Sequence, residues 1–191
     1  MVELDLILIC MSYSIGIIFS LIVSYLVFNS TFPHYKIKII NERIWVESLE
    51  KLFKLAKKEI IFTTLAFSTL DIHKRIELAL DDALLRGIKI DIIGARGIMP
   101  EGRYNKLKRK GCNVILIPKI ILDRDDKFWH HLMVVDSKHW LWIHPHEPEK
   151  REVHFGYYKL FDIDNAKKYR EKLVQLKRFE NITEDEISNN G

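Results

Sequence analysis

The sequence predicts an α/β domain with a mixed, mostly parallel sheet and helices on both faces, preceded by one N-terminal transmembrane helix. From residue 36 onward, apolar strand-like segments alternate with segments of helical periodicity. Before that point, residues 6–33 carry no charged side chain. The 191-residue chain, 48% hydrophobic and 29% charged, has room for one globular domain and an attachment.

Residues 6–28 are predicted to form the membrane anchor, because about 20 apolar residues suffice to cross a bilayer. The alternative is a cleaved signal peptide, which usually has a basic N-terminal flank, whereas Glu3 and Asp5 lie here. Basic residues begin only at Lys36, after the apolar segment. The positive-inside rule therefore predicts a single-pass membrane protein whose C-terminal domain is cytoplasmic. The predicted parts are an extracytoplasmic N-terminus at 1–5, the anchor at 6–28, a linker at 29–35, the domain at 36–179 and an acidic, disordered tail at 180–191.

The first half of the domain shows two strand–helix units. Residues 34–40 alternate like a strand, and from Asn41 apolar residues recur on one helical face. Residues 59–67 are β-branched and aromatic, which favours a buried strand. Ser68 and Asp71 resemble a capping box, followed by a second apolar stripe over 72–84 that includes Leu80 and ends before Gly87.

The second half continues the alternation. Residues 88–94, including Ile92, form a strand, Pro100–Lys110 a basic helix ended by Gly111, and 112–118 another apolar strand. Residues 129–136 and 138–144 are predicted as two strands joined at Asp136-Ser137, followed by a strand-like segment at 153–162 and a closing helix at 163–179. Cys10 and Cys112 provide no disulfide framework.

Charge is distributed unevenly, since all 30 lysines and arginines follow residue 35. Such a basic surface suits phosphates, nucleic acid or anionic lipid head groups. The alternative is a solvated, lysine-rich exterior without a specific partner. The densest cluster, a candidate contact for an anionic surface, comprises Arg103, Lys106, Lys108, Arg109 and Lys110.

The order of these elements resembles the phospholipase D superfamily over about residues 36 to 179. The resemblance rests on the run IIFTTLAFSTLDIHKRIELALDDALLRGIKIDIIGARG, then a basic helix, KRKGCNVILIP and HHLMVVD. Within it, Arg86-Gly87-Ile88 and Gly111-Cys112-Asn113-Val114 occupy two of the family's marker positions. Short bacterial members are nucleases with one motif per chain that dimerise, so the resemblance implies a homodimer and a phosphodiester substrate.

The family's chemistry depends on His-x-Lys-x4-Asp, in which the histidine attacks phosphorus and the lysine holds a phosphate oxygen. If Asp136 is the motif's aspartate, a gap-free alignment puts Trp129 at the nucleophile and His131 at the lysine. One deletion puts His130 at the nucleophile, but Leu132 then replaces the lysine. The downstream Gly-Ser falls at Ile143-His144, and the asparagine becomes His146.

The motif is therefore degenerate, and we expect no catalytic residues. The segment that replaces Gly-Ser, HPHEPEKREVHFGYYKLFDIDNAKKYREKL, also resembles the non-catalytic sensor domains of archaeal sugar-responsive transcriptional regulators. The predicted function is binding of an anionic ligand or a protein partner, with His131, Lys138, His144 and His146 as ligand-binding residues. The alternative is an active phosphodiesterase or endonuclease that uses His130 or His131, with Asp136, in a rearranged homodimeric site.

Simpler interpretations remain for several of these residues. His131 is equally compatible with a partly buried histidine that has a backbone partner. The His144–Glu147 segment contains zinc-ligand residue types, but its spacing matches no metal motif, so we expect neither a metal nor a cofactor. Trp129, Trp140 and Trp142 favour core and rim positions over a nucleotide-stacking platform.

Overall fold

The computed structural model describes residues 16–20, 23, 36–39, 41–65, 67, 73–124, 128–143 and 156–183. The chain divides into two units, residues 1–35 and 36–191. In the first unit, the described residues 16–20 and 23 are helical and exposed. The second unit contains the sheet and every element discussed below.

Within the described ranges, no helix is long and apolar enough to cross a membrane. This finding contradicts the transmembrane helix predicted at residues 6–28, and with it the predicted single-pass membrane localisation. The longest described helices have 14 residues. At 1.5 Å per residue such a helix is about 21 Å long, which is short of the roughly 30 Å of a hydrocarbon core. The remainder of 6–28 lies outside the described residues.

Within the described residues, seven strands form one mixed sheet in the order β1-β7-β6-β5-β2-β3-β4. Of the six strand pairs in this sheet, β2–β3 and β3–β4 are parallel, and the other four are antiparallel. The prediction of a mixed sheet is confirmed, but "mostly parallel" is wrong, because β5, β6 and β7 pair antiparallel with their neighbours in the sheet. The strands are β1 (Lys36–Ile39), β2 (Glu59–Thr64), β3 (Lys89–Ala95), β4 (Asn113–Ile117), β5 (Leu132–Val135), β6 (His139–Ile143) and β7 (Gly156–Lys159).

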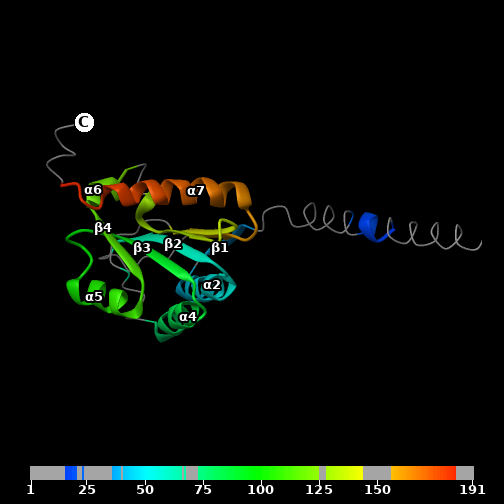
Figure 1. The fold of residues 1–191 in the computed structure, drawn as a ribbon, viewed down its shortest axis with the longest axis horizontal. Helices are drawn as coiled ribbons and strands as arrows, with labels where there is room; N and C mark the ends of the chain where they lie inside the picture. The colour runs from blue at the N-terminus through cyan, green and yellow to red at the C-terminus, as the bar shows by residue number, and fades with distance from the viewer. Residues whose placement is uncertain are drawn as a thin grey trace, which may run out of the picture. The chain divides into compact units, whose positions relative to one another are not determined.

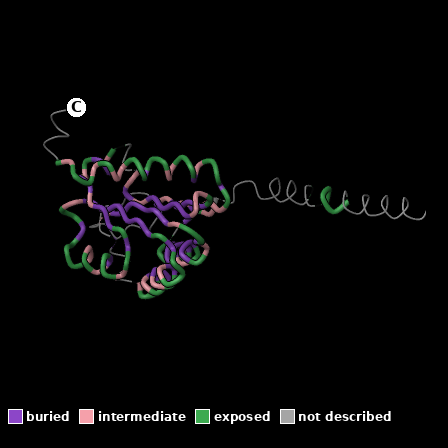
Figure 2. The backbone as a smooth tube through the Cα atoms, in the orientation of Figure 1, coloured by how far each residue is buried: buried purple, intermediate pink, exposed green. Residues whose placement is uncertain are grey.

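Helices cover both faces of the sheet (Figure 1). On one face lie α2 (Glu42–Leu55), α4 (Lys74–Leu85) and α5 (Glu101–Lys110). On the other lie the short α6 (Lys119–Leu122) and the long α7 (Ile163–Leu176), which continues into the 3-10 turn η2 (Lys177–Phe179). The sheet is consequently buried between two helical layers whose outer surfaces are exposed (Figure 2).

Local sequence explains where these helices begin and end. The Asn41 side chain accepts a hydrogen bond of 2.9 Å from the Ile44 N–H and so caps α2. Gly111 ends α5 in the left-handed conformation, with a φ of 101° that favours glycine. Leu80 and Ile92 are fully buried in the core on the α4 side, as predicted.

The segment before β5 differs from the prediction. A continuous strand from Trp129 was expected, but Phe128–His130 form a 3-10 turn, η1, and β5 begins at Leu132. Helix α6 was not predicted, because four residues are too few for a periodic pattern. The predicted capping box at Ser68–Asp71 and the start of the 153–162 strand lie outside the described residues.

Candidate functional site

The candidate site lies at the sheet edge where the parallel strands β2, β3 and β4 end. Strand β5 runs antiparallel to β2 with Met133 opposite Phe62, so its first residue and the preceding histidines lie at that same edge. Thr63 fixes this start of β5, because its hydroxyl accepts from the Leu132 N–H at 3.0 Å and donates to the Leu132 carbonyl at 3.3 Å. Open α/β sheets commonly bind ligands beyond the carboxyl ends of parallel strands.

His130 is buried and bound to an acidic partner. It ends η1, is 4% exposed, and its Nε2 lies 2.6 Å from Asp123 Oδ1. The other oxygen of Asp123 accepts from the Lys119 ammonium group. Burial, the largest influence, raises the pKa of Asp123, but the bonds from Lys119 and His130 outweigh it and the pKa is lowered. Nε2 of His130 is therefore engaged by Asp123, and the burial of the ring leaves little access for a phosphorus atom.

Trp129 and His131, the motif positions in the gap-free register, lie on either side of His130. Trp129 packs partly buried against the core on the α7 side. His131 is half-buried, and its carbonyl oxygen accepts from the Ile143 N–H at 3.0 Å. The rings of His130 and His131 are nearly perpendicular, with centroids 6.3 Å apart. Of these three residues, Trp129 and His131 are partly exposed and His130 is buried.

Asp136 and Lys138 do not join the histidines. Four strand residues separate His131 from Asp136, which puts them at opposite edges of the sheet, about 16 Å apart along the strand. The Asp136 carboxylate accepts three backbone N–H groups, from Lys57 and Lys58 at 2.8 Å and from Glu59 at 2.9 Å. Asp136 therefore fixes the turn before β2, and the exposed Lys138 lies on that side as well.

Two of the five residues in the basic cluster on α5, Lys106 and Lys110, attach α5 to α4. Lys106 and Lys110 lie 3.1 and 3.2 Å from Glu77 Oε1, and Lys110 also lies 2.7 Å from Asp81 Oδ1. Hydrogen bonds from Lys74, Lys106 and Lys110 lower the pKa of Glu77 to about 2. The Arg109 Nε donates to the Asn105 carbonyl at 3.3 Å, and the Lys108 ammonium lies 4.8 Å from the Tyr104 ring centroid. Arg103 is half-buried.

The other candidates have mainly structural surroundings or cannot be described. His144, His146 and Glu147 lie outside the described residues. Trp140 is buried and donates its Nε1–H to Asp162 at 2.9 Å. Trp142 stacks on Tyr157, with the two ring centroids 6.3 Å apart. Burial raises the pKa of the Cys112 thiol to about 12, so Cys112 is not an activated nucleophile. Across the ranges that the structure describes, no three metal-binding side chains gather.

Sequence reasoning missed Lys119, Asp123 and Arg96 at this edge. Lys119 and Asp123 are spaced as an i, i+4 pair across α6. Arg96 follows β3 directly, and its guanidinium donates to the carbonyl oxygens of Leu116, Glu180 and Ile182. An arginine at the end of a predicted parallel strand was a signal for this edge, but its partners in the C-terminal segment were not foreseeable.

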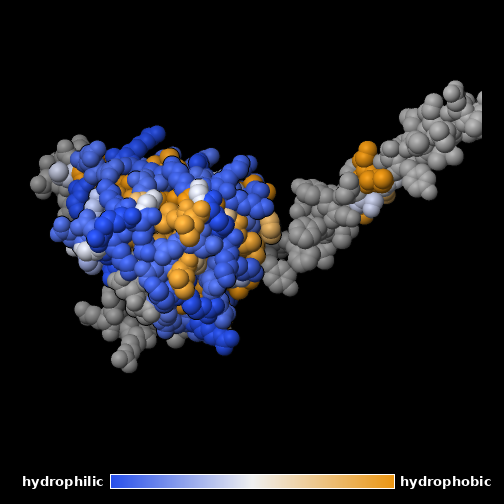
Figure 3. All heavy atoms as spheres, turned by 60° about the horizontal axis from the view of Figure 1, so that its bottom comes forward, coloured by the Kyte–Doolittle hydropathy of each residue, from blue (hydrophilic) through white to orange (hydrophobic). Residues whose placement is uncertain are grey.

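The surface over the α2–α4–α5 layer is mostly hydrophilic, with apolar patches (Figure 3).

The arrangement of strands and helices is similar to that of several solved structures. NucT from Helicobacter pylori superimposes with a TM-score of 0.58 at 15% identity, over 76% of this chain and 97% of its own. The phospholipase D family member Nuc from Salmonella typhimurium gives 0.53 at 12%, over 75% and 95%. The archaeal chromatin protein TrmBL2 gives 0.51 at 12%, over 86% of this chain and 62% of its own.

The chain therefore has the phospholipase D-like fold, as the sequence resemblance implied. No family description and no curated sequence matches it. At these identities the structural likeness defines the fold alone.

Proposed function

We propose that this protein is a phospholipase D-like domain that binds a phosphate-bearing ligand at the carboxyl edge of β2–β4 without hydrolysing it. The observation that carries the proposal is the state of His130. This histidine is 4% exposed, and its Nε2 is held 2.6 Å from Asp123. Trp129 and His131 occupy the neighbouring positions. Neither the gap-free alignment nor the alignment with one deletion therefore places a histidine and a lysine at the two His-x-Lys positions.

Anion binding without catalysis is supported by the charges at this edge. Lys119, Arg96 and a protonated His131 supply positive charge, and Asp123 is the opposing carboxylate, already shared by Lys119 and His130. Loss of one preorganised donor typically costs a phosphoryl-transfer or acyl-transfer site about 3–4 kcal/mol of transition-state stabilisation. A site that lacks both nucleophile and lysine retains binding more readily than turnover.

The test combines a turnover assay with a pH series. The full chain is incubated without divalent metal with bis(p-nitrophenyl) phosphate and with DNA, and we expect no hydrolysis above buffer. Binding of dimethyl phosphate is then measured by calorimetry between pH 5.5 and 8. Affinity should fall as pH rises, because imidazole ordinarily loses its charge near pH 6.5. His131→Ala should flatten this dependence, and His131→Lys should keep affinity at pH 8 without creating an enzyme.

Two outcomes contradict the proposal. Metal-free hydrolysis that His130→Ala or His131→Ala abolishes would make the protein an active phosphodiesterase with a rearranged site, and a dimer in solution would then be expected. Phosphate binding that is indifferent to pH and to His131 would leave these histidines as ordinary strand-end residues.

A further inference from the structure

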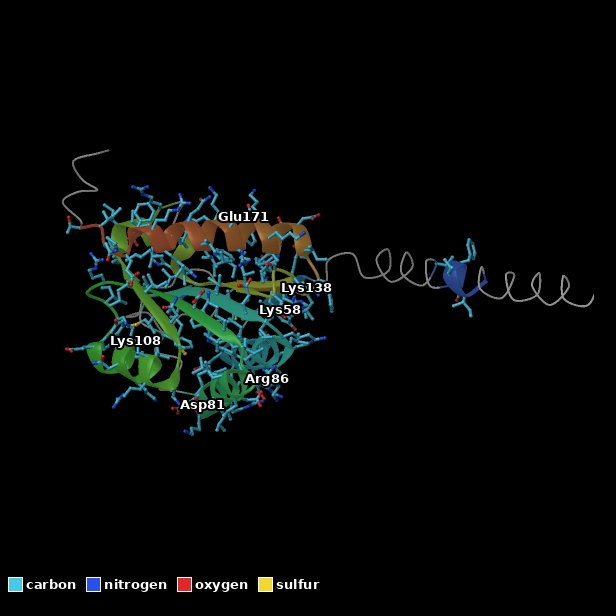
Figure 4. The ribbon with its side chains drawn as sticks, in the orientation of Figure 1. Lys58, Asp81, Arg86, Lys108, Lys138 and Glu171 are labelled. Atoms are coloured by element: carbon cyan, nitrogen blue, oxygen red, sulfur yellow. The ribbon has the colours of Figure 1, made fainter. Side chains whose placement is uncertain are left out.

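The edge of the sheet opposite the candidate site carries a row of lysines that backbone hydrogen bonds hold together. Asp136 accepts the N–H groups of Lys57 and Lys58, and the Lys89 N–H donates to the Lys58 carbonyl at 3.0 Å. Lys138 follows Asp136 by two residues, in the turn between β5 and β6. Lys58 and Lys138 accordingly lie side by side at this end of the sheet, well away from Lys108 (Figure 4).

The lysines in this row are available to a partner. All four are exposed, and within the described part of the chain the ammonium groups of Lys57, Lys58 and Lys138 form no ion pair. Lys89 Nζ lies 3.6 Å from Asp91. Three carboxylates at this edge are already bound, whereas Asp164, three residues after Phe161, is exposed. Asp136 holds three N–H groups, Glu59 is paired with Arg170, and Asp91 is bound by Lys177 and Asn113.

An exposed aromatic ring extends the row. Phe161 is 61% exposed and has a φ of 58°, a conformation that a non-glycine residue keeps only when its surroundings impose it. Its N–H donates to His139 Nδ1 at 3.1 Å, and the two rings pack edge to face with centroids 4.8 Å apart. His139 directly follows Lys138, so the fixed ring and the lysine are neighbours. Backbone strain that presents a large apolar ring to solvent points to a function for that ring.

The members of the row follow the strand order of the sheet. Phe161 follows β7, and Lys138 directly precedes β6. Asp136 directly follows β5, Lys57 and Lys58 precede β2, and Lys89 is the first residue of β3. Adjacent strands lie about 4.8 Å apart, so the row spans about 19 Å from β7 to β3. The row is thus a narrow line of lysine side chains with the Phe161 ring at the β7 end.

We propose that this row, Phe161 with Lys138, Lys57, Lys58 and Lys89, binds single-stranded nucleic acid without sequence preference. The lysines contact successive phosphates, and a base stacks on the Phe161 ring. Lysine contacts to phosphates together with stacking on aromatic rings are the means by which proteins bind single strands. A duplex keeps its bases stacked inside and would leave Phe161 unused. A bilayer requires apolar bulk but no fixed planar ring, whereas the backbone and His139 hold this ring rigidly.

The test measures binding of a fluorescein-labelled dT12 oligonucleotide to the full chain by anisotropy across a salt series. For single strands the slope of log affinity against log salt is about −0.7 per neutralised phosphate. Lys58→Ala/Lys138→Ala should therefore reduce the slope by about 1.4. The matched control Lys167→Ala/Lys172→Ala removes two exposed charges from α7 and should leave the slope unchanged. Phe161→Ala and Phe161→Leu should each weaken binding at least about fivefold at constant slope, and Phe161→Trp should retain it.

Lys58→Ala/Lys138→Ala, at the other edge from His131, should leave the pH-dependent binding of dimethyl phosphate unchanged, which separates this inference from the proposed function. Thermal unfolding of each variant checks that the fold is retained. Three results would overturn the proposal. The first is dT12 affinity indifferent to Phe161 and to the Lys58/Lys138 pair, and the second is dT12 binding lost in His131→Ala. The third is absence of dT12 binding together with binding to phosphatidylserine vesicles that Phe161→Leu retains, which would assign the row to a bilayer.

Discussion

His139 illustrates how one buried side chain makes stability depend on pH. The ring is 4% exposed, and its Nδ1 accepts the Phe161 N–H, so the neutral form suits the fold. Burial is the largest influence and lowers the pKa of His139, Lys138 acts in the same direction, and Asp136 opposes them. Protonation therefore costs the folded state more than the unfolded one.

The first prediction follows from that sign. Below pH 6.5 the unfolded chain takes up a proton that the folded His139 resists, so the free energy of unfolding should fall as pH drops from 7.5 toward the folded pKa. Urea unfolding at pH 7.5 and pH 5 measures this fall. His139→Asn keeps an acceptor for Phe161 but cannot titrate, so it should reduce the fall. His73→Asn, at a partly exposed histidine paired with Glu42, is the matched control. An equal fall in the wild type and His139→Asn would contradict the prediction.

The site residues show why sequence located the site only in part. The HHLMVVD segment contains a strand, β5, as predicted, but the motif grouped Asp136 with histidines that β5 places at the other edge. Asp136 instead stabilises the turn before β2, residues about 80 positions earlier in the chain, by accepting their N–H groups. The partner of His130, Asp123, depends on the short α6, which has no periodic signal.

At the scale of single elements, α4 separates a core face from an exposed one within three residues. Leu80 is fully buried in the core between α4 and the sheet, whereas Leu78 is 57% exposed. Both were part of a helix whose apolar stripe the sequence revealed, because the 3.6-residue period distinguishes the two faces. That is also why the helices and the inner strands were predicted more accurately than the short elements.

The second prediction uses this pair as its own control. Leu80→Ala should lower the free energy of unfolding by about 2–5 kcal/mol, because it removes buried methyl groups and leaves a cavity. Leu78→Ala should change it by less than about 0.5 kcal/mol. Urea denaturation at pH 7 gives both values. Similar losses at the two positions would mean that the outer face of α4 is covered in solution.

A third prediction concerns the pairing of β6 with β7. A Cβ added at Gly156 would lie 2.2 Å from the Trp142 carbonyl oxygen, a backbone atom that cannot move alone. Gly156→Ala should therefore destabilise the fold by about 1–3 kcal/mol, since overpacking forces backbone shifts. Gly102→Ala, on the exposed part of α5 with open space around it, is the control and should be neutral or slightly stabilising. A neutral Gly156→Ala would show that the two strands separate more easily than this contact implies.

At the scale of the whole molecule, buried carboxylates connect the helices to the sheet. Asp91 on β3 is 1% exposed and is bound by Lys177 after α7 and by Asn113 on β4. Burial is the largest influence and raises its pKa, but these partners outweigh it and the pKa is lowered. Asp162, bound by Trp140, Asn165 and Lys159, behaves in the same way. The pairs of Asp91 with Lys177 and of Asp162 with Trp140 were not predictable from sequence, because they join elements that are distant in the chain.

The last prediction is that acid weakens the whole fold in a window distinct from that of His139. Where the folded pKa is lowered, the unfolded chain binds more protons, so stability is complete above the carboxylates' ordinary pKa near 4 and falls as pH drops through the folded pKa. For Glu77, whose pKa is about 2, the loss extends to about pH 2. Urea midpoints at pH 5, 4, 3 and 2.5 should therefore decline steadily. Asp91→Asn should cost about 3–5 kcal/mol at pH 5, because it leaves Lys177 without its buried partner. The urea midpoint of the Asp91→Asn variant should also decline less than that of the wild type between pH 4 and 2.5. Glu171→Gln, at an exposed position on α7 (Figure 4), should leave the curve unchanged. A wild-type midpoint that is constant down to pH 2.5 would mean that these carboxylates keep ordinary pKa values and that apolar burial alone holds α7 on the sheet.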